Sequence, residues 1–470
     1  MPSLIWLTDR SRYETGTGRC GMQRYLRYHA GPSGYGYAMK AESVPLTTGS
    51  ASHQGLEGLA TILRDTDTLP TPEQVRQVIA RIRDTYETNL ELKGFRGGMY
   101  SSPIIDETIK EQSTLIHGLV WTIALKFLPW LHKNYRVLEV EQERLHFFSC
   151  TCGAGPLAEQ AAHDAKGCTG MALMIKTDIL AEHRLGRHLA YFEGKTTGWE
   201  SDAWAEQWET KPQLALGTLD LHHKYGRDVS EIYVVGMSKG SRKKDKGVPE
   251  DHPLYGMRRQ QSSLCYGYCR PGNPPLAKDD WLPAYEWINE AGESKRVSKA
   301  HKRRGVWEMV ESDWSLWHAY KSSDPEMVVE EFWARQLPES VMDKVVFVLG
   351  PMNRQDQQLL SLERGMKAEE DRWQQILWAL YEFQTTTGKG WESPDFQELI
   401  DRLIPRSWNC RPFGKEHECE FVQLCFKHAG WQTPLTMGRY QLRRPHHAPE
   451  TVQAVERGLL VAEAQEIEEE

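Results

Sequence analysis

The 470-residue sequence lacks a long uninterrupted apolar run. Its longest one, "GLVWTIALKFLPWL" at residues 118–131, contains Lys126 and Pro129, whereas a membrane-spanning helix needs about 20 apolar residues in succession. The first residues, "MPSLIWLTDRSRYETG", also lack the apolar core of a secretory signal. We therefore expect a soluble intracellular protein of the cytoplasm, with no membrane partner.

The sequence also lacks internal repeats and an overall positive charge. Its formal net charge of −8 means that a nucleic-acid partner would need a local basic surface. Residues 238–305 offer one, because 15 Lys and Arg residues there oppose eight Asp and Glu residues. This basic insertion could follow a DNA backbone, with Tyr266, Tyr268 and Trp281 as stacking candidates. The alternative is a solvated charged loop.

Hydrophobic periodicity predicts a mixed α/β core. The expected helices cover residues 50–64 (capped by Ser50 or Ser52), 73–92, 106–132, 202–224 and 355–384. The expected strands cover residues 171–180, 188–196, 230–237 and 343–350, and residues 135–150 form one further strand or a hairpin.

Two of these strands end in charged residues. The first reaches Asp178, and the second ends in Glu193-Gly194-Lys195. Because residues two apart in a strand share a face, Tyr191, Glu193 and Lys195 project together. Pairing of the two strands as a hairpin would add Asp178 to the group. Such a group suits Mg²⁺ and a phosphate, whereas the alternative is a surface ion pair on a solvated strand end.

Two helical residues favour a site over a surface ion pair. His53 lies three residues before Leu56, so it shares the apolar side of its helix. Gln213 lies on the helix that follows Lys195. Each residue alone is an ordinary helix residue, and their value lies in their combination with the charged strand ends.

Nine cysteines in an intracellular chain indicate metal or redox chemistry more than disulfides. Cys410, Cys419 and Cys425 have the spacing C-x8-C-x5-C, and Cys20 lies near the other end of the sequence. One distant cysteine and three clustered ones can hold an iron–sulfur cluster that connects the two ends. The alternative is four unconnected reduced cysteines.

In their order along the chain, these residues resemble the RecB-type nucleases of the PD-(D/E)XK superfamily. The branch concerned carries an iron–sulfur cluster and includes CRISPR-adaptation nucleases and nuclease domains of bacterial helicase–nuclease complexes. The matching positions are Cys20, His53, Asp178, the Glu193-Gly194-Lys195 triplet, Gln213 and the three late cysteines. The resemblance implies a restriction-endonuclease-like mixed sheet flanked by helices, with a helical N-terminal elaboration and a C-terminal iron–sulfur segment.

The resemblance also implies roles for these residues. Asp178 and Glu193 would bind Mg²⁺ or Mn²⁺ with help from His53. Lys195 would assist the attacking water, and Gln213 would support the site. A 4Fe–4S cluster would be held by Cys20, Cys410, Cys419 and Cys425.

The sequence departs from this family in two places. Many members have a tyrosine four residues after the glutamine, where this chain has Gly217, so the substrate contact of that helix is in question. Cys410 and Cys419 are also more widely spaced than usual, which leaves the cluster type open.

Two further groups of residues remain open. Cys150, Cys152, His163 and Cys168, spaced C-x-C-x10-H-x4-C, can either bind Zn²⁺ or form a pair of buried cysteines with a loop histidine. Glu139, Glu141 and Glu143 alternate along one strand. One of the three could approach the metal, although exposure is the usual fate of strand glutamates.

The implied function is a metal-dependent DNA nuclease, most simply an exonuclease on single strands or DNA ends, with a helicase or a recombination or repair protein as a further partner. Alternatives are a DNA-binding or scaffolding protein of recombination or replication with the same fold, and a sequence-specific endonuclease that uses residues 238–305 for recognition. The expected parts are an N-terminal segment (1–48), a nuclease core in two sections (49–237 and 306–400), the basic insertion (238–305), an iron–sulfur segment (401–445) and an acidic tail (446–470).

Overall fold

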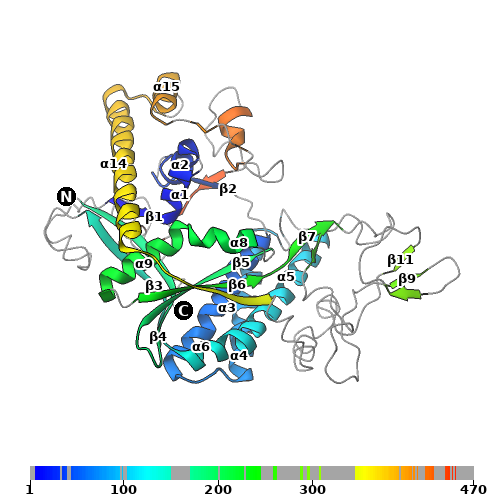
Figure 1. Ribbon diagram of the computed structural model, residues 1–470. Helices are drawn as coiled ribbons and strands as arrows, with labels where there is room; N and C mark the ends of the chain where they lie inside the picture. The colour runs from blue at the N-terminus through cyan, green and yellow to red at the C-terminus, as the bar shows by residue number, and fades with distance from the viewer. Residues whose placement is uncertain are drawn as a thin grey trace.

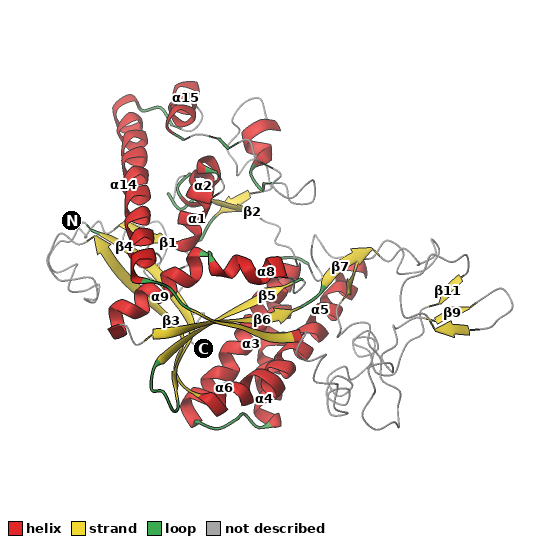
Figure 2. Cartoon of the chain, in the orientation of Figure 1, coloured by secondary structure: helices red, strands yellow, loops and turns green. Residues whose placement is uncertain are grey.

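A central mixed sheet with helices on both faces organises the protein (Figure 1, Figure 2). The computed structural model describes residues 6–18, 20–31, 34–39, 44–95, 98, 103–149, 170–198, 202–226, 229–244, 258–261, 286–288, 294–296, 306–308, 345–390, 393–404, 406, 407, 410, 419–427, 440–444, 447 and 450. Within these residues the expected α/β class is confirmed.

The sheet has six strands in the order β1-β4-β5-β6-β12, with β3 paired to β4. The strands are β1 (Trp6–Asp9), β3 (Tyr135–Ser149), β4 (Met171–His183), β5 (Leu189–Thr197), β6 (Val229–Ser238) and β12 (Val346–Met352). Most of β4 is buried on both of its faces, as expected for a strand with helices on either side. Residues 135–149 form one long strand, which settles the choice between a strand and a hairpin.

Strand β4 carries the fork of the sheet. β3 pairs antiparallel with one edge of β4 along nearly all of its length. On the other edge, β1 pairs in parallel with Met171–Met174, and β5 pairs antiparallel with Ile179–Glu182. Residues 175–178 therefore have no partner on this edge among the described strands, and the sheet opens there.

One face of the sheet is covered by α3 (Val44–Thr66), α4 (Pro72–Leu92), α5 (Pro103–Thr122), the π-helical turn η1 (Ile123–Phe127) and α6 (Leu128–Asn134) (Figure 1). The largest hydrophobic core lies between these helices and the sheet. α3 begins before Ser50, and the Ser52 hydroxyl donates to the Thr48 carbonyl inside the helix, so the predicted serine cap is wrong.

One helical stretch of the described chain, Leu115–Asn134, is long and apolar enough to cross a membrane by length and composition. Its mean hydropathy is 1.2, and 67% of it is buried inside the fold. That burial is what a core helix of a soluble domain shows.

The other face carries α1 (Arg10–Gly18), α9 (Pro212–Tyr225) and the long helix α14 (Asp356–Thr387) (Figure 1). The single helix predicted at residues 202–224 is wrong: the segment consists of α8 (Asp202–Glu206), the 3-10 turn η2 (Gln207–Glu209) and α9. Pro212 starts α9 at its first turn, where a proline costs no hydrogen bond.

A smaller region joins the two ends of the chain, and we call it the cysteine region. It contains α2 (Gly21–Tyr28), α15 (Pro394–Leu403), the π-helical turn η6 (Gln423–Lys427) and a two-stranded sheet of β2 (Tyr37–Met39) and β13 (Tyr440–Leu442). These elements pack on a second core together with the C-terminal half of α14. A fully buried ion pair, Arg24–Glu370 at 2.6 Å, joins α2 to α14.

The predicted basic insertion lies mostly outside the described residues. Its described parts include the paired strands β7 (Ser241–Lys244) and β8 (Arg258–Gln261) and the paired strands β9 (Glu286–Ile288) and β10 (Ser294–Arg296). β11 (Val306–Glu308) pairs with the other side of β9.

Candidate active site

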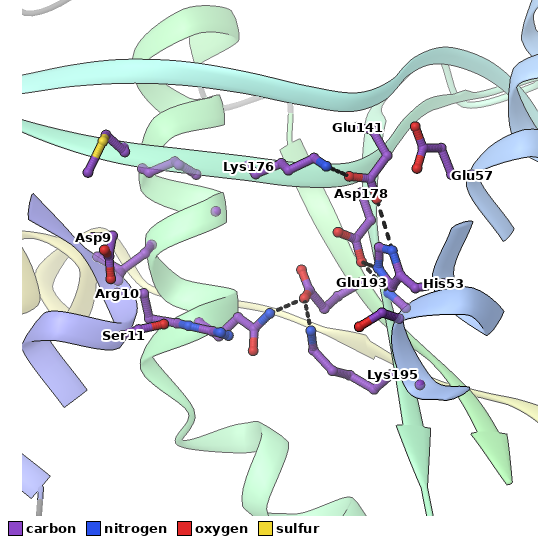
Figure 3. Close-up of a pocket in the computed structure, with 18 of the residues that line it drawn as sticks. Asp9, Arg10, Ser11, His53, Glu57, Glu141, Lys176, Asp178, Glu193 and Lys195 are labelled. Carbon is purple, nitrogen blue, oxygen red and sulfur yellow. Dashed lines mark hydrogen bonds and ion pairs between the residues drawn. The ribbon is translucent and has the colours of Figure 1, made fainter. Parts of the chain in front are cut away.

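A pocket of about 820 Å³ lies at the fork of the sheet, between the end of β1 and the end of β5 (Figure 3). Residues of α1, α3, α9 and the strands β3, β4 and β5 line it. The lining includes the five residues that the sequence predicts to act together: His53, Asp178, Glu193, Lys195 and Gln213. They come from α3, β4, β5 and α9, on both faces of the sheet.

Helix α3 places His53 against Asp178, which lies inside β4 because the strand continues to His183 and not, as the sequence suggested, only to residue 180. Its Nε2 lies 2.8 Å from Oδ2 of Asp178, and its Nδ1 lies 3.1 Å from Oε1 of Glu141 (Figure 3). The backbone N–H of Gly194 donates to the same Asp178 oxygen at 2.7 Å. A Cβ atom at position 194 would lie 2.7 Å from Leu56, so the glycine lets α3 approach β5 closely enough for these contacts.

Glu193 is almost completely buried, with 1% of its surface exposed. The Tyr191 hydroxyl donates to its Oε2, and the side-chain amide of Gln213 donates to its Oε1. Lys195 Nζ lies 2.6 Å from the same Oε1 (Figure 3). Residues 191, 193 and 195 therefore share one side of β5, as the strand period predicts, and the hairpin pairing of β4 with β5 is confirmed.

The electrostatics of the pocket are those of crowded carboxylates. Burial and the charge of Asp178 raise the pKa of both Glu193 and Glu141. Burial acts to raise the pKa of Asp178 as well, but the charge and hydrogen bond of His53, the charge of Lys195 and the Gly194 N–H together outweigh it, and the pKa is lowered. Burial opposes protonation of His53, yet the charges of Asp178 and Glu141 raise its pKa to about 9.

The residues present fit a divalent cation. His53, Glu141 and Asp178 offer donor atoms that all lie within 4.8 Å of one another. Oε1 of Glu141 is buried and accepts no well-aligned hydrogen bond in the described part of the chain, so it has room for a positive partner. Two carboxylates and an imidazole suit Mg²⁺ or Mn²⁺, and His53 would release its proton to act as a ligand.

Glu141 is the site residue that the sequence identified least clearly. Alternation along the strand puts it on one face with Glu139 and Glu143, but Glu139 bonds Arg144 and Lys224 beside α9, while Glu141 points into the pocket (Figure 3). The cause is the backbone of Glu141, whose φ of 52° departs from the extended conformation on which regular alternation depends. Such strained backbone costs of order 1–3 kcal/mol and is found most often at functional sites.

Both ends of the described chain also reach the pocket wall. Asp9 ends β1, Arg10 and Ser11 begin α1, and His447 follows the last short strand. His447 pairs with Glu143 of β3 through its Nδ1. Lys239, just after β6, closes another side, and burial lowers its pKa. No local pattern in the sequence marks these residues, because β1 and the C-terminal residues reach the pocket only through long-range pairing.

The glycine at position 217 has a visible consequence. Gly217 lies one turn after Gln213 on α9, and a Cβ atom there would lie 2.8 Å from the ring of Tyr191. Tyr191 therefore fills the space beside α9, and its hydroxyl bonds Glu193. Tyr191 of β5 therefore occupies the space in which the resemblance leads us to expect a tyrosine side chain from position 217 of α9.

The four cysteines assigned to a cluster lie in the cysteine region, away from the pocket. None of the four forms a disulfide, and all four side chains are half-buried. Cys20, Cys419 and Cys425 pack on one hydrophobic core, and the N–H of Cys419 donates to the carbonyl of Cys410 at 2.7 Å. In addition to burial, Cys20 and Cys410 both act electrostatically on Cys419 and on Cys425 and raise the pKa of each, so the four side chains lie near one another.

The predicted zinc residues Cys150, Cys152, His163 and Cys168 lie outside the described residues, as do the stacking candidates Tyr266, Tyr268 and Trp281. A scan against protein-family models matches no family, and a search of curated proteins finds no significant match. The argument for function therefore rests on the geometry of the pocket and on the resemblance carried by its residues.

Proposed function

We propose that the protein is a Mg²⁺- or Mn²⁺-dependent DNA nuclease with a restriction-endonuclease-like core, acting on single strands or DNA ends. The observation that carries the proposal is the meeting of His53, Asp178, Glu193, Lys195 and Gln213 in one pocket. His53 and Gln213 are 160 positions apart (213 − 53), so neighbouring positions in the sequence do not explain why the five residues meet. The 4Fe–4S cluster, the DNA partner and a helicase or recombination partner belong to this proposal.

The residues divide into two groups by their contacts. Asp178, Glu141 and His53 would hold the cation, and the resemblance adds Glu193 as a further ligand. The cation would supply charge neutralisation at a phosphate and a lowered pKa for bound water. Lys195 and Gln213 both contact Oε1 of Glu193, so they fix the orientation of that carboxylate. The Lys195 ammonium then lies beside the carboxylates, where it can orient an attacking water or take up phosphate charge.

Two cations on the pocket wall are suited to hold the DNA backbone. Arg10 begins α1 on one side, and Lys239 follows β6 on the other. This arrangement supports a phosphodiester substrate over an uncharged one.

The test is digestion of end-labelled single-stranded DNA by the full-length protein with Mg²⁺ or Mn²⁺. We expect Asp178→Asn and Lys195→Met to lower the cleavage rate by more than the roughly 10–100-fold that outer-shell changes cost at metal sites. The matched control is Glu182→Gln, on the same strand but outside the pocket, which should cleave normally. DNA binding without cleavage by the wild-type protein would instead support the scaffolding alternative, and full activity in Asp178→Asn would remove the assignment.

A further inference from the structure

A second group of metal-binding side chains lies away from the pocket. His146 of β3, His223 of α9 and Glu363 of α14 offer donor atoms that all lie within 4.8 Å of one another. None of the three lines the pocket. We propose that they form a binding site for a transition-metal dication, and that Zn²⁺ is the ion that fits their chemistry best.

The distances agree with ligands that share one ion. Nε2 of His146 lies 3.4 Å from Oε1 of Glu363. A good N–H···O hydrogen bond is expected at about 2.7–3.2 Å, so this contact is long for a direct bond. Two donor atoms that are each about 2.0–2.1 Å from a tetrahedral zinc ion lie about 3.4 Å apart. The imidazole ring of His223 is next to that of His146, with ring centroids 4.4 Å apart.

The donor types select the ion. Two imidazoles and one carboxylate are the protein ligands of many zinc sites with an open fourth position, whereas Mg²⁺ and Ca²⁺ prefer all-oxygen sites. His146 is fully buried, but the side chain of Glu363 is 21% exposed. The site therefore has a dry, fixed side on the sheet and an open side through which an ion could enter and a water could complete the shell.

The position of the group suggests what a bound ion would do. α9 and α14 pack together on one face of the sheet, where α14 also contacts β3 (Figure 1). Near the site, Arg144 of β3 already pairs with Asp220 of α9 at 2.5 Å. A bound ion would link α14, through Glu363, to β3 and α9. Since α14 also packs on the cysteine region, the site would fix the long helix that connects that region to the sheet.

The test uses the full-length protein, stripped with a chelator and reloaded with Zn²⁺ or Co²⁺. We expect wild type to hold about one equivalent more zinc than His223→Gln, and to show visible Co²⁺ bands of a tetrahedral nitrogen and oxygen site that this variant lacks. Subtracting the variant removes contributions from the pocket and the cysteines. Zinc should also raise the thermal midpoint of wild type more than that of the variant.

The matched control is His222→Gln, the preceding residue on α9. Its Nε2 bonds the carbonyl of Val229 at 3.0 Å and does not belong to the group. Glu363→Gln is a second test variant, because its half-buried side chain can change with little effect on folding. Zinc loss in His223→Gln and Glu363→Gln but not in His222→Gln supports the site. Equal zinc content in wild type and both test variants, or equal loss in the control, overturns it.

Discussion

The pocket and the cysteine region differ in the charge state of their buried titratable side chains. In the pocket, Asp178 faces His53, and Glu193 faces Lys195, so each of these carboxylates has a cation beside it. In the cysteine region, burial raises the pKa of Cys419 to about 11. Burial therefore keeps the Cys419 thiol neutral at pH 7.

The pKa of Cys425 is raised even further than that of Cys419. Burial raises its pKa to about 12, and the nearby charge of Arg406 offsets only part of that rise. A group of thiolates would need a strongly positive partner before it could form, whereas the lowered pKa of Asp178 keeps that pocket carboxylate charged in the folded chain. If the proposed cluster is present, we expect the cysteine region to depend on it more than the pocket depends on its cation.

The largest effect should follow from removing the proposed cluster. Structural metal sites can supply on the order of 10 kcal/mol of folding free energy. We expect Cys419→Ser, purified without oxygen, to lose its iron and its visible absorption and to become protease-sensitive around residues 406–442. Fragments mapped by mass spectrometry should show that the sheet stays protected.

The control for this change is Cys265→Ser, which removes a cysteine to which the resemblance gives no role. It should keep its iron and the wild-type cleavage pattern. If wild type itself is colourless, free of iron and as resistant as Cys419→Ser, the four cysteines are plain thiols and the two regions do not differ in the way proposed.

The sequence predicts the pocket residues well where local geometry decides. The strand period places Tyr191, Glu193 and Lys195 on one side, and the hairpin adds Asp178. Neither inference needs the rest of the fold. The same reasoning misleads at Glu141, because alternation holds only for regular extended strands and the positive φ of this residue turns its side chain into the pocket.

Long-range convergence accounts for the rest. His146, His223 and Glu363 each stand alone in the sequence, on a strand and two helices, and no spacing rule joins them. The same holds for β1, a four-residue strand whose pairing with β4 builds one side of the fork. Contacts of this kind depend on how the layers stack, which a single sequence does not specify.

A smaller effect on stability tests whether a buried titratable group stays neutral wherever it lacks an opposite charge, in the sheet region as well as in the cysteine region. His117 is a buried group of the sheet region whose pKa is lowered to about 3 by burial and by the charges of Arg83 and Arg76. Its neutral form is stable in the fold, and below about pH 6.5 the unfolded chain binds the extra proton. Stability should therefore fall by about 1–2 kcal/mol between pH 7 and pH 5 through this residue.

Urea unfolding of wild type and His117→Gln at the two pH values measures this contribution. The variant should be less stable at pH 7 but should lose less stability on acidification. An identical loss of stability in both proteins would mean that the fold does not keep His117 neutral. The effect of burial on titratable groups would then be limited to the thiols of the cysteine region.

The smallest expected effect on stability concerns Glu141, a buried pocket carboxylate that lies beside another carboxylate, Asp178. Its pKa is raised by burial and by Asp178, and its φ of 52° is strained for a glutamate. Asparagine tolerates this conformation and carries no charge, so Glu141→Asn should raise the free energy of unfolding by about 1 kcal/mol. Lys176, which pairs with Glu141, is half exposed and can be solvated instead.

Activity should change in the opposite direction, because the variant lacks a carboxylate that would hold the cation. We expect cleavage by Glu141→Asn to require a higher Mn²⁺ concentration than wild type. Glu143→Asn, on the same strand without a positive φ, is the control and should gain no stability. A more stable and less active Glu141→Asn would show that the pocket holds strain and charge for its function, whereas a variant with lower stability and full activity would place Glu141 among the residues that only support the fold.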